Sequence, residues 1–262
     1  MELRTQTLTR LVTPMREGGS LPALAEADDG FKYVVKLRGA GHGVKALIAE
    51  LIGGEVARAL RFRVPELVFV HLDESFGRTE PDEEVQDLLR GSVGLNLGMH
   101  FLSGAFTADP TVNPPTPEEA SRLVWLDAFL TNVDRTVRNP NLLVWHGETW
   151  LIDHGASLIF HHSMSDPAKA ALSPFPYVKD HVYLPYASLL EQTDRDIRQR
   201  ITPRTLSGIA ALIPDEWLAD PSAFGDMDPG KIRSMYSDFL IRRLSESAVF
   251  TKQAIDERRK LI

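Results

Sequence analysis

The chain has 262 residues, a formal net charge of −7 and a pI near 5.6. Hydrophobic residues make up 43% and charged residues 25%, the balance of a globular protein with a real core, and no apolar run is long enough to predict a transmembrane helix. The absence of cysteine excludes disulfides, thiolate metal sites and cysteine nucleophiles, and the acidic balance argues against a nucleic-acid partner. With no apolar leader after Met1, we expect a cytoplasmic protein without a membrane partner.

The first hundred residues carry a mixed pattern of strands and helix. Asp28-Asp29-Gly30 is a turn signal between two apolar runs, and it predicts a hairpin from 21–25 into 31–37. The second run contains Tyr33-Val34-Val35, and aromatic and β-branched residues favour a strand.

A glycine-rich loop, 39–43, follows this strand. Apolar residues then recur at helical spacing, which predicts a helix over 44–60. After Pro65, residues 66–72 have the composition of a strand, and the charged residues 73–84 are expected to form a solvated loop.

The proline-rich segment 106–117 is the expected boundary between two lobes. It ends in Thr116-Pro117, where a threonine N-cap precedes proline at the first helical position. Glu119 is placed to complete a capping box, so we predict a helix that begins here and continues to about Leu130.

The second half is predicted to be mostly helical. Two short apolar runs, 142–145 and 149–152, flank a turn at His146-Gly147-Glu148 and predict a hairpin. The last predicted helix covers about 229–247, with an apolar stripe over 232–244 that we expect to lie in the core.

A polar loop around the second hairpin is the strongest chemical signal. Asp134 begins the loop, Asn139 and Asn141 end it, and Asp153 lies just beyond the second strand. Phosphoryl transfer requires these groups, because one carboxylate orients the attacking hydroxyl while amide and carboxylate oxygens bind Mg²⁺. A hairpin would hold them at fixed spacing.

The first half supplies the complementary groups. Lys36 ends a predicted strand, and Glu50 lies fourteen positions on in the following helix, so the two can form an ion pair that holds the ammonium against nucleotide phosphates. Gly18-Gly19-Ser20 precede the hairpin, and their backbone N–H groups could face phosphate oxygens; a simple turn is the alternative.

Together these motifs resemble the HipA-like kinases, over roughly residues 10–160. The resemblance implies an α+β, two-lobed protein-kinase-like fold, with a β-rich nucleotide-binding lobe over 1–102 that contains one long helix. A mostly helical lobe over 103–262 would carry the catalytic loop and the metal site. The resemblance rests on Tyr33-Val34-Val35-Lys36, Glu50, Val64-Pro65-Glu66, Asn132-Val133-Asp134, Asn139, Asn141 and Asp153-His154-Gly155.

The resemblance also implies roles for single residues. Lys36 would contact the phosphates of ATP and pair with Glu50, and Asp134 would be the catalytic base. Asn139 or Asn141, together with Asp153, would hold Mg²⁺. The hinge that binds adenine through backbone hydrogen bonds would be Met99-His100-Phe101-Leu102.

The sequence departs from the family pattern at three points. A spacing of five residues from Asp134 selects Asn139 as the metal ligand, whereas the apolar strand directly after the asparagine selects Asn141. We favour Asn141, because Pro140 restricts the residue before it to an extended backbone. His154 replaces the phenylalanine of the usual Asp-Phe-Gly and is expected to change how that loop packs. The chain is also short for HipA toxins, so their extra N-terminal domain and toxin role are not carried over.

We therefore predict an ATP- and Mg²⁺-dependent phosphotransferase that acts on a hydroxyl, most simply that of a protein serine or threonine. One alternative is a nucleotide-binding pseudokinase with a regulatory or scaffolding role. Another is a metal-dependent phosphoesterase that uses Asp153 and the nearby histidines. The adjacent His161 and His162 argue against it, since they are expected to point to opposite sides.

The arginines of the second half are interspersed with acids and are predicted to lie on exposed helix faces, not to form a nucleic-acid-binding stripe. They are Arg195, Arg198, Arg200, Arg204, Arg242, Arg243, Arg258 and Arg259.

Overall fold

A computed structural model describes residues 2–15, 21–78, 80–163 and 166–261. Gly18, Gly19 and Ser20, the predicted phosphate loop, lie outside these residues. None of the helices in the described part of the chain is both long and apolar enough to span a membrane.

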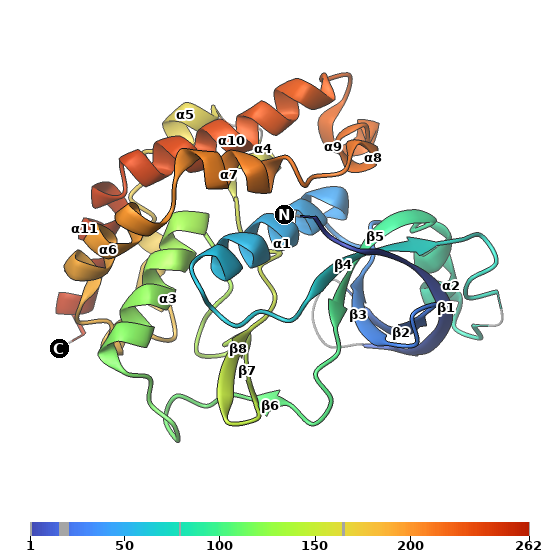
Figure 1. Cartoon of the computed structure of the whole chain (residues 1–262), viewed down its shortest axis with the longest axis horizontal. Coiled ribbons are helices and arrows are strands. Elements are labelled where there is room, and N and C mark those ends of the chain that lie inside the picture. Colours follow the sequence, from blue (N-terminus) through green and yellow to red (C-terminus); the bar gives the residue numbers. More distant parts are fainter. Residues whose placement is uncertain (1, 16–20, 79, 164–165, 262) are drawn as a thin grey trace.

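Five strands form a closed barrel in the N-terminal half, in the order β1-β2-β3-β5-β4 (Figure 1). β1 pairs antiparallel with β2 and parallel with β4, and this parallel pair closes the barrel. The predicted hairpin is confirmed, with Ala25 opposite Tyr33. Every second side chain along β2 and β3 is buried, and these buried side chains are alanines on β2 and Tyr33 and Val35 on β3. The strands are β1 (Thr5–Pro14), β2 (Ala23–Ala27), β3 (Lys32–Lys36), β4 (Leu67–Leu72) and β5 (Gly94–His100).

The strand β5 was not predicted, because glycine and asparagine weaken its strand pattern. Gly98 is required there, since a Cβ atom at this position would lie 2.9 Å from Val70 Cγ1 across the barrel. The predicted loop 73–84 needs a correction at its end, where helix α2 (Glu83–Arg90) begins. Asp82 caps α2, and Val85 and Leu89 bury its apolar side against the barrel.

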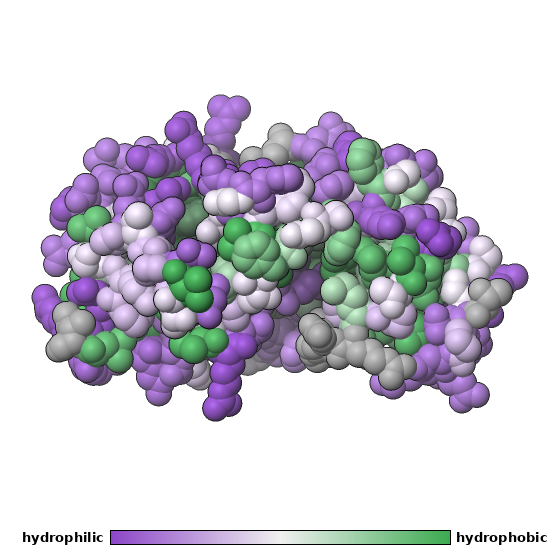
Figure 2. Space-filling view, turned by 90° about the horizontal axis from the view of Figure 1, so that it is seen from below, coloured by the Kyte–Doolittle hydropathy of each residue, from purple (hydrophilic) through white to green (hydrophobic). Residues whose placement is uncertain are grey.

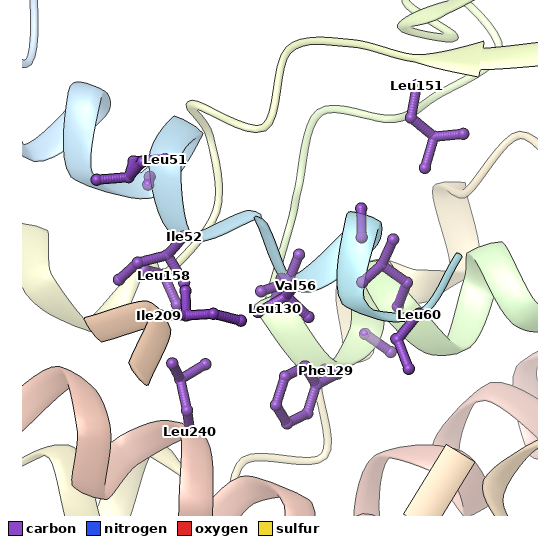
Figure 3. Close-up of a cluster of buried hydrophobic side chains, with 14 of the residues drawn as sticks. Leu51, Ile52, Val56, Leu60, Phe129, Leu130, Leu151, Leu158, Ile209 and Leu240 are labelled. Atoms are coloured by element: carbon purple, nitrogen blue, oxygen red, sulfur yellow. The ribbon is translucent and has the colours of Figure 1, made fainter. Parts of the chain in front are cut away.

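Helix α1 (Gly43–Ala59) agrees with the predicted helix to within one residue at each end. It is buried on almost every side, and its apolar side chains share one core with the helices of the C-terminal half. Figure 3 shows Ile52 of α1 beside Leu158 and Ile209, and Val56 of α1 beside Leu130. α1 therefore joins the barrel to the helical half and fixes where its polar residue Glu50 lies.

The C-terminal half begins with a small sheet and continues as helices. The sheet has the order β6-β7-β8, with β6 at Phe106–Thr107, and the predicted hairpin is confirmed as β7 (Leu142–Trp145) and β8 (Glu148–Leu151). α3 (Pro117–Leu130) has the predicted bounds. The predicted helix 229–247 is α10, but it is not the last one, since α11 follows. The other elements are α4 (Phe160–Ser163), α5 (Pro167–Ala170), η1 (Pro176–Asp180), η2 (Leu184–Tyr186), α6 (Leu190–Arg200), α7 (Pro203–Ala210), α8 (Asp215–Leu218), α9 (Pro221–Phe224), α10 (Pro229–Ser245) and α11 (Ala248–Arg259).

Arg243 corrects the expectation that these arginines are exposed. Its side chain is fully buried, and its guanidinium donates to Ala128 O and Phe129 O at the C-terminal end of α3. It also donates to Ala171 O and Ser173 O. Helix ends leave carbonyl groups without partners, and a buried guanidinium has enough donors to satisfy several of them.

The short helices α8 and α9 attach the helical half to the barrel (Figure 1). Trp217 Nε1 donates to Leu95 O at 2.8 Å, and the Trp217 ring packs against Phe69 of β4. Arg38, just after β3, forms ion pairs with Glu216 and with Asp220. The barrel is thus held at a second place besides α1.

The capping box predicted for α3 is present. Thr116 Oγ1 accepts from Glu119 N at 3.2 Å, and Glu119 Oε2 accepts from Thr116 N at 2.9 Å. We expect Thr116→Ala to lower the free energy of unfolding by about 1 kcal/mol, because Glu119 N loses its side-chain acceptor at the start of the helix. Urea unfolding measures this loss, and Thr116→Ser is the matched control that keeps the cap. Equal stability of Thr116→Ala and the unmodified protein would contradict the expectation.

Candidate active site

Three charged side chains from distant elements meet between the barrel and the helical half. Lys36 ends β3, Glu50 lies in the middle of α1 and Asp153 follows β8. Lys36 Nζ donates to Asp153 Oδ1 at 2.6 Å, and it lies 3.5 Å from Glu50 Oε2, an ion-pair distance without hydrogen-bond geometry. The predicted ion pair between Lys36 and Glu50 is confirmed.

The charges of this cluster stabilise one another. Burial alone would lower the pKa of Lys36, but the nearby carboxylates of Glu50 and Asp153 raise it to about 12. Burial alone would raise the pKa of Glu50, yet the Lys36 ammonium, with a smaller contribution from His154, lowers it to about 2. Lys36 is therefore a cation at neutral pH whose side chain is 13% exposed, suited to meet phosphate oxygens.

His154 sets the loop that carries Asp153 against α1. Its side chain is fully buried, with Nδ1 3.7 Å from Glu50 Oε1. α1 makes room for it with Gly53, where a Cβ atom would lie only 2.4 Å from His154 Cβ. Asp153 itself has φ +55°, a left-handed backbone that turns the chain sharply after β8. The altered packing expected for this loop is thus a direct contact with α1.

Asp134 faces both candidate asparagines. Asp134 Oδ2 accepts from Asn139 Nδ2 at 2.6 Å and from Asn141 Nδ2 at 3.4 Å. Asn139 is exposed, whereas Asn141 is buried and has φ +50°. Both amide groups thus lie at the same carboxylate, so the choice between them as metal ligand stays a prediction.

The environment of Asp134 changes its acidity. The half-buried position raises the pKa of its carboxyl above the usual range, and the negative charge of Asp153 raises it further. The two asparagine amides act in the opposite direction. A raised pKa makes this carboxylate a better proton acceptor than an exposed aspartate, which is the property a general base needs.

A buried network of hydrogen bonds and ion pairs, which the sequence analysis did not predict, supports the loop that carries Asp134. Asp127 of α3 accepts from Arg135 Nε at 2.6 Å, from Asn132 Nδ2 at 3.0 Å and from His181 Nε2 at 3.0 Å. The charge of Arg135 offsets the effect of burial and holds the pKa of Asp127 far below its usual range. One feature of the sequence could have indicated this network. An aspartate lies within the apolar helix segment 123–130, where a buried charge needs a partner.

Arg135 also ties the two halves of the site together. Its Nη1 donates to Asn141 O at 2.6 Å and lies 3.4 Å from Ile152 O, the residue before Asp153. One guanidinium therefore fixes the backbone beside a candidate amide ligand and beside the second aspartate. Arg135 positions the site without contributing to it directly.

The predicted hinge follows directly from the barrel. Met99 lies in β5 opposite Val34 and Leu67, and its side chain is buried. His100 N donates to Glu66 O, and Phe101 N donates to Lys32 O, both at 2.9 Å. The sheet thus already uses the N–H groups of His100 and Phe101, so Leu102 is the residue of this segment best placed to donate to an adenine.

Figure 2 shows the surface hollowed between the two halves of the molecule.

We expected His161 and His162 to point to opposite sides, but the structure brings their rings together. Both lie in α4, where neighbouring residues are about 100° apart, and His161 Nε2 lies 3.2 Å from His162 Nε2. His161 Nδ1 contacts the Tyr236 hydroxyl at 2.9 Å, and the His162 ring packs on His42 at the start of α1. Among the described residues no set of three His, Cys, Asp or Glu side chains is placed to hold a metal ion.

This histidine cluster predicts sensitivity to mild acid. Burial lowers the pKa of His161 well below its usual value, and His162, Lys45 and His42 lower it further. The unfolded chain takes up this proton near pH 6.5 while the folded protein resists it, so stability is full above about pH 7 and falls as the pH drops to 5. The lowered pKa of Glu50 matters only below about pH 4.5.

Urea unfolding at pH 7.5, 6.5 and 5.5 measures the effect. His161→Gln should reduce the loss of stability between pH 7.5 and 5.5, while the exposed His71→Gln should leave it unchanged. An unaltered pH slope in His161→Gln would show that this cluster does not carry the effect.

The barrel, the connecting helix and the convergent Lys36, Glu50, Asp134 and Asp153 are the features of a kinase-like phosphotransferase. The sequence matches the HipA-like kinase family over residues 8–244, so the chain belongs to this family of phosphotransferases, whose phosphoryl donor is ATP. Among solved structures, it is similar to a proinflammatory kinase, CtkA, of Helicobacter pylori. The TM-score is 0.54 and the identity 12%, with 95% of each chain covered, so this likeness shows the fold. No curated protein sequence matches the chain.

Proposed function

We propose that this protein transfers the γ-phosphoryl group of ATP, with Mg²⁺, to the hydroxyl of a protein serine or threonine. One observation carries the proposal. The chain brings Lys36 into hydrogen-bond contact with Asp153, 117 positions away, beside a second carboxylate, Asp134, that holds two amides. In-line phosphoryl transfer needs a cation for the phosphates, oxygen ligands for a metal and a carboxylate for the acceptor hydroxyl.

The donor set fits magnesium. Asp153 offers a carboxylate, and Asn139 and Asn141 offer amide oxygens that accept no hydrogen bond from the described residues. Magnesium prefers such hard oxygen ligands and commonly uses only one or two protein groups together with phosphates. When bound, the ion offsets negative charge on the transferred group. Asp153 and one of the two asparagines would hold it.

The remaining residues have separate tasks. Lys36, held by Glu50, neutralises phosphate oxygens of the nucleotide. The adenine binds to the backbone of the hinge that contains Met99, Phe101 and Leu102, with Leu102 N as the donor. Asp134 orients the acceptor hydroxyl and takes its proton as the bond between the γ-phosphorus and the ADP oxygen breaks and the new phosphate ester bond forms, with ADP as the leaving group. Residues 1–102 act as the nucleotide-binding lobe and 103–262 as the catalytic lobe.

Incubation with γ-labelled ATP, Mg²⁺ and a cell extract tests the proposal. We expect label on protein serine or threonine, and loss of labelling when EDTA removes magnesium or when Lys36→Met removes the ammonium. The exposed Lys252→Met is the matched control. Thermal stabilisation by ATP without any transfer would instead indicate a pseudokinase. Hydrolysis of phosphate esters without nucleotide would indicate a phosphoesterase.

The metal ligand is tested by the magnesium requirement. Asn139→Ala and Asn141→Ala each remove one candidate amide. The variant that needs at least about tenfold more Mg²⁺ for half-maximal transfer identifies the ligand, since loss of even an outer partner of a metal ligand lowers metal affinity about 10–100-fold.

A further inference from the structure

A groove of about 610 Å³ lies on the catalytic loop, on the side where η1 packs. Backbone hydrogen bonds join the two segments that form this groove. Val182 N donates to Arg135 O at 3.1 Å, and Thr136 forms an antiparallel bridge with His181. The lining on the loop comes from Val133 and from residues 136–138, which directly flank Asp134. Whatever fills this groove therefore touches the loop that carries the proposed base.

Several exposed apolar side chains line the groove. Val137 is 78% exposed and Tyr177 is 54% exposed, while Val133 and Leu261 are also exposed on the same lining. Large apolar side chains gathered at one exposed place are a feature of binding surfaces, whereas single ones are common everywhere.

Unpaired cations surround these apolar side chains. Arg138 and Lys179 line the groove, and neither forms an ion pair with any described residue, while Asp180 is the one carboxylate on the lining. A second hollow is lined by Arg258, whose Nε donates to Pro185 O on the wall of the first. This hollow adds Arg195, Arg258 and Arg259 and one acid, Glu191. Five cations and two carboxylates line the two hollows, on a chain whose net charge is −7. One of the five, Arg259, pairs with Asp256, and the other four form no ion pair with a described residue.

We propose that this groove docks an acidic segment of the protein acceptor, with apolar residues between its acids. The proposal rests on the proposed function and adds the class of acceptor. Aspartates or glutamates of the segment would pair with Arg138 and Lys179, and an apolar side chain would cover Val137 and Tyr177. Charge complementarity of this kind selects partners and speeds their encounter. The apolar lining favours a protein segment over a nucleic acid, which would need a longer basic stripe.

Fluorescence anisotropy with labelled peptides tests the proposal without requiring transfer. The probe is a twelve-residue peptide that alternates glutamate and leucine around one serine. Matched peptides carry lysine or glutamine in place of glutamate, and a single-stranded RNA of twelve nucleotides is the nucleic-acid probe. We expect only the acidic peptide to bind, with an affinity that falls as salt is raised.

Charge reversal locates the binding. Arg138→Glu combined with Lys179→Glu should weaken binding of the acidic peptide about tenfold or more, since two attractions become repulsions. Arg204→Glu, at an exposed position of α7 that lines neither hollow, is the matched control and should leave the affinity unchanged. A normal ATP-induced thermal shift in the double variant shows that the protein remains folded and separates this test from that of the proposed function.

Several results would overturn the proposal. They are equal binding of the acidic, neutral and basic peptides, tighter binding of the RNA, or an unchanged affinity in the double variant. Concentration-dependent dimerisation that the double variant abolishes would assign the groove to a second copy of this chain instead.

Discussion

Asp134→Asn is expected to lower the rate of phosphoryl transfer about 10²–10⁴-fold, the usual contribution of a positioned general base. Asparagine keeps the size of the side chain but cannot take a proton. The loss should fall on the rate of transfer, because Lys36 and Asp153, which the account assigns to the nucleotide, keep their contact with each other. Rates with γ-labelled ATP and a thermal-shift titration with ATP measure the two properties separately.

The matched control is Asp238→Asn, on an exposed face of α10. It changes the same charge far from the site and should leave both properties unaltered. Transfer at the normal rate in Asp134→Asn would remove Asp134 from the chemistry. If ATP binding and transfer were both lost, Asp134 would act on the nucleotide and not on the acceptor.

The largest expected loss of stability comes from Asp127→Ala. Asp127 and Arg135 are both fully buried and joined at 2.6 Å, so alanine leaves a buried guanidinium without its counter-charge. Removing one partner of such a pair costs about 3–5 kcal/mol in the free energy of unfolding. Asn132 and His181 lose their acceptor as well. Urea unfolding measures the change, and the exposed Asp238→Ala is the matched control.

A second substitution separates the lost pair from the lost volume. Asp127→Ala combined with Arg135→Met removes both charges, so its cost should be smaller than the sum of the two single costs. Costs that simply add would show that the two side chains contribute independently, and the network would then not be the support of the catalytic loop.

Local signals in the sequence determine several elements almost to the residue. Helix α3 begins after Thr116 and ends at Leu130 as predicted, because a capping box fixes its start through bonds among neighbours in sequence. The hairpins β2–β3 and β7–β8 follow likewise from turn residues between apolar runs. Where the determining contacts are local, the sequence pattern suffices.

Other features depend on contacts between distant residues. β5 is a strand because both of its edges are paired in the barrel, although Gly94, Asn96 and Gly98 disfavour one locally. Arg243 is buried because the end of α3, more than a hundred positions earlier, needs donors. The residues that pair with β5 and with Arg243 lie far away in the sequence, and no local pattern indicates them. The strand and the buried arginine were therefore not predicted.

The candidate site shows the same division. Lys36, Glu50, Asp134 and Asp153 could be singled out because their order along the chain and their residue types match a known chemistry. The support by Asp127 and Arg135 could not be predicted, because it depends on three segments meeting behind the loop. The choice between Asn139 and Asn141 depends on side-chain oxygens, which two residues so close in sequence do not distinguish.

A crystal structure with a non-hydrolysable ATP analogue and Mg²⁺ tests the central claim most directly. We predict the triphosphate beside Lys36, the metal on Asp153 and one of the two asparagines, and the terminal phosphate facing Asp134. A nucleotide bound elsewhere, or a triphosphate that contacts neither Lys36 nor Asp153, would contradict the account.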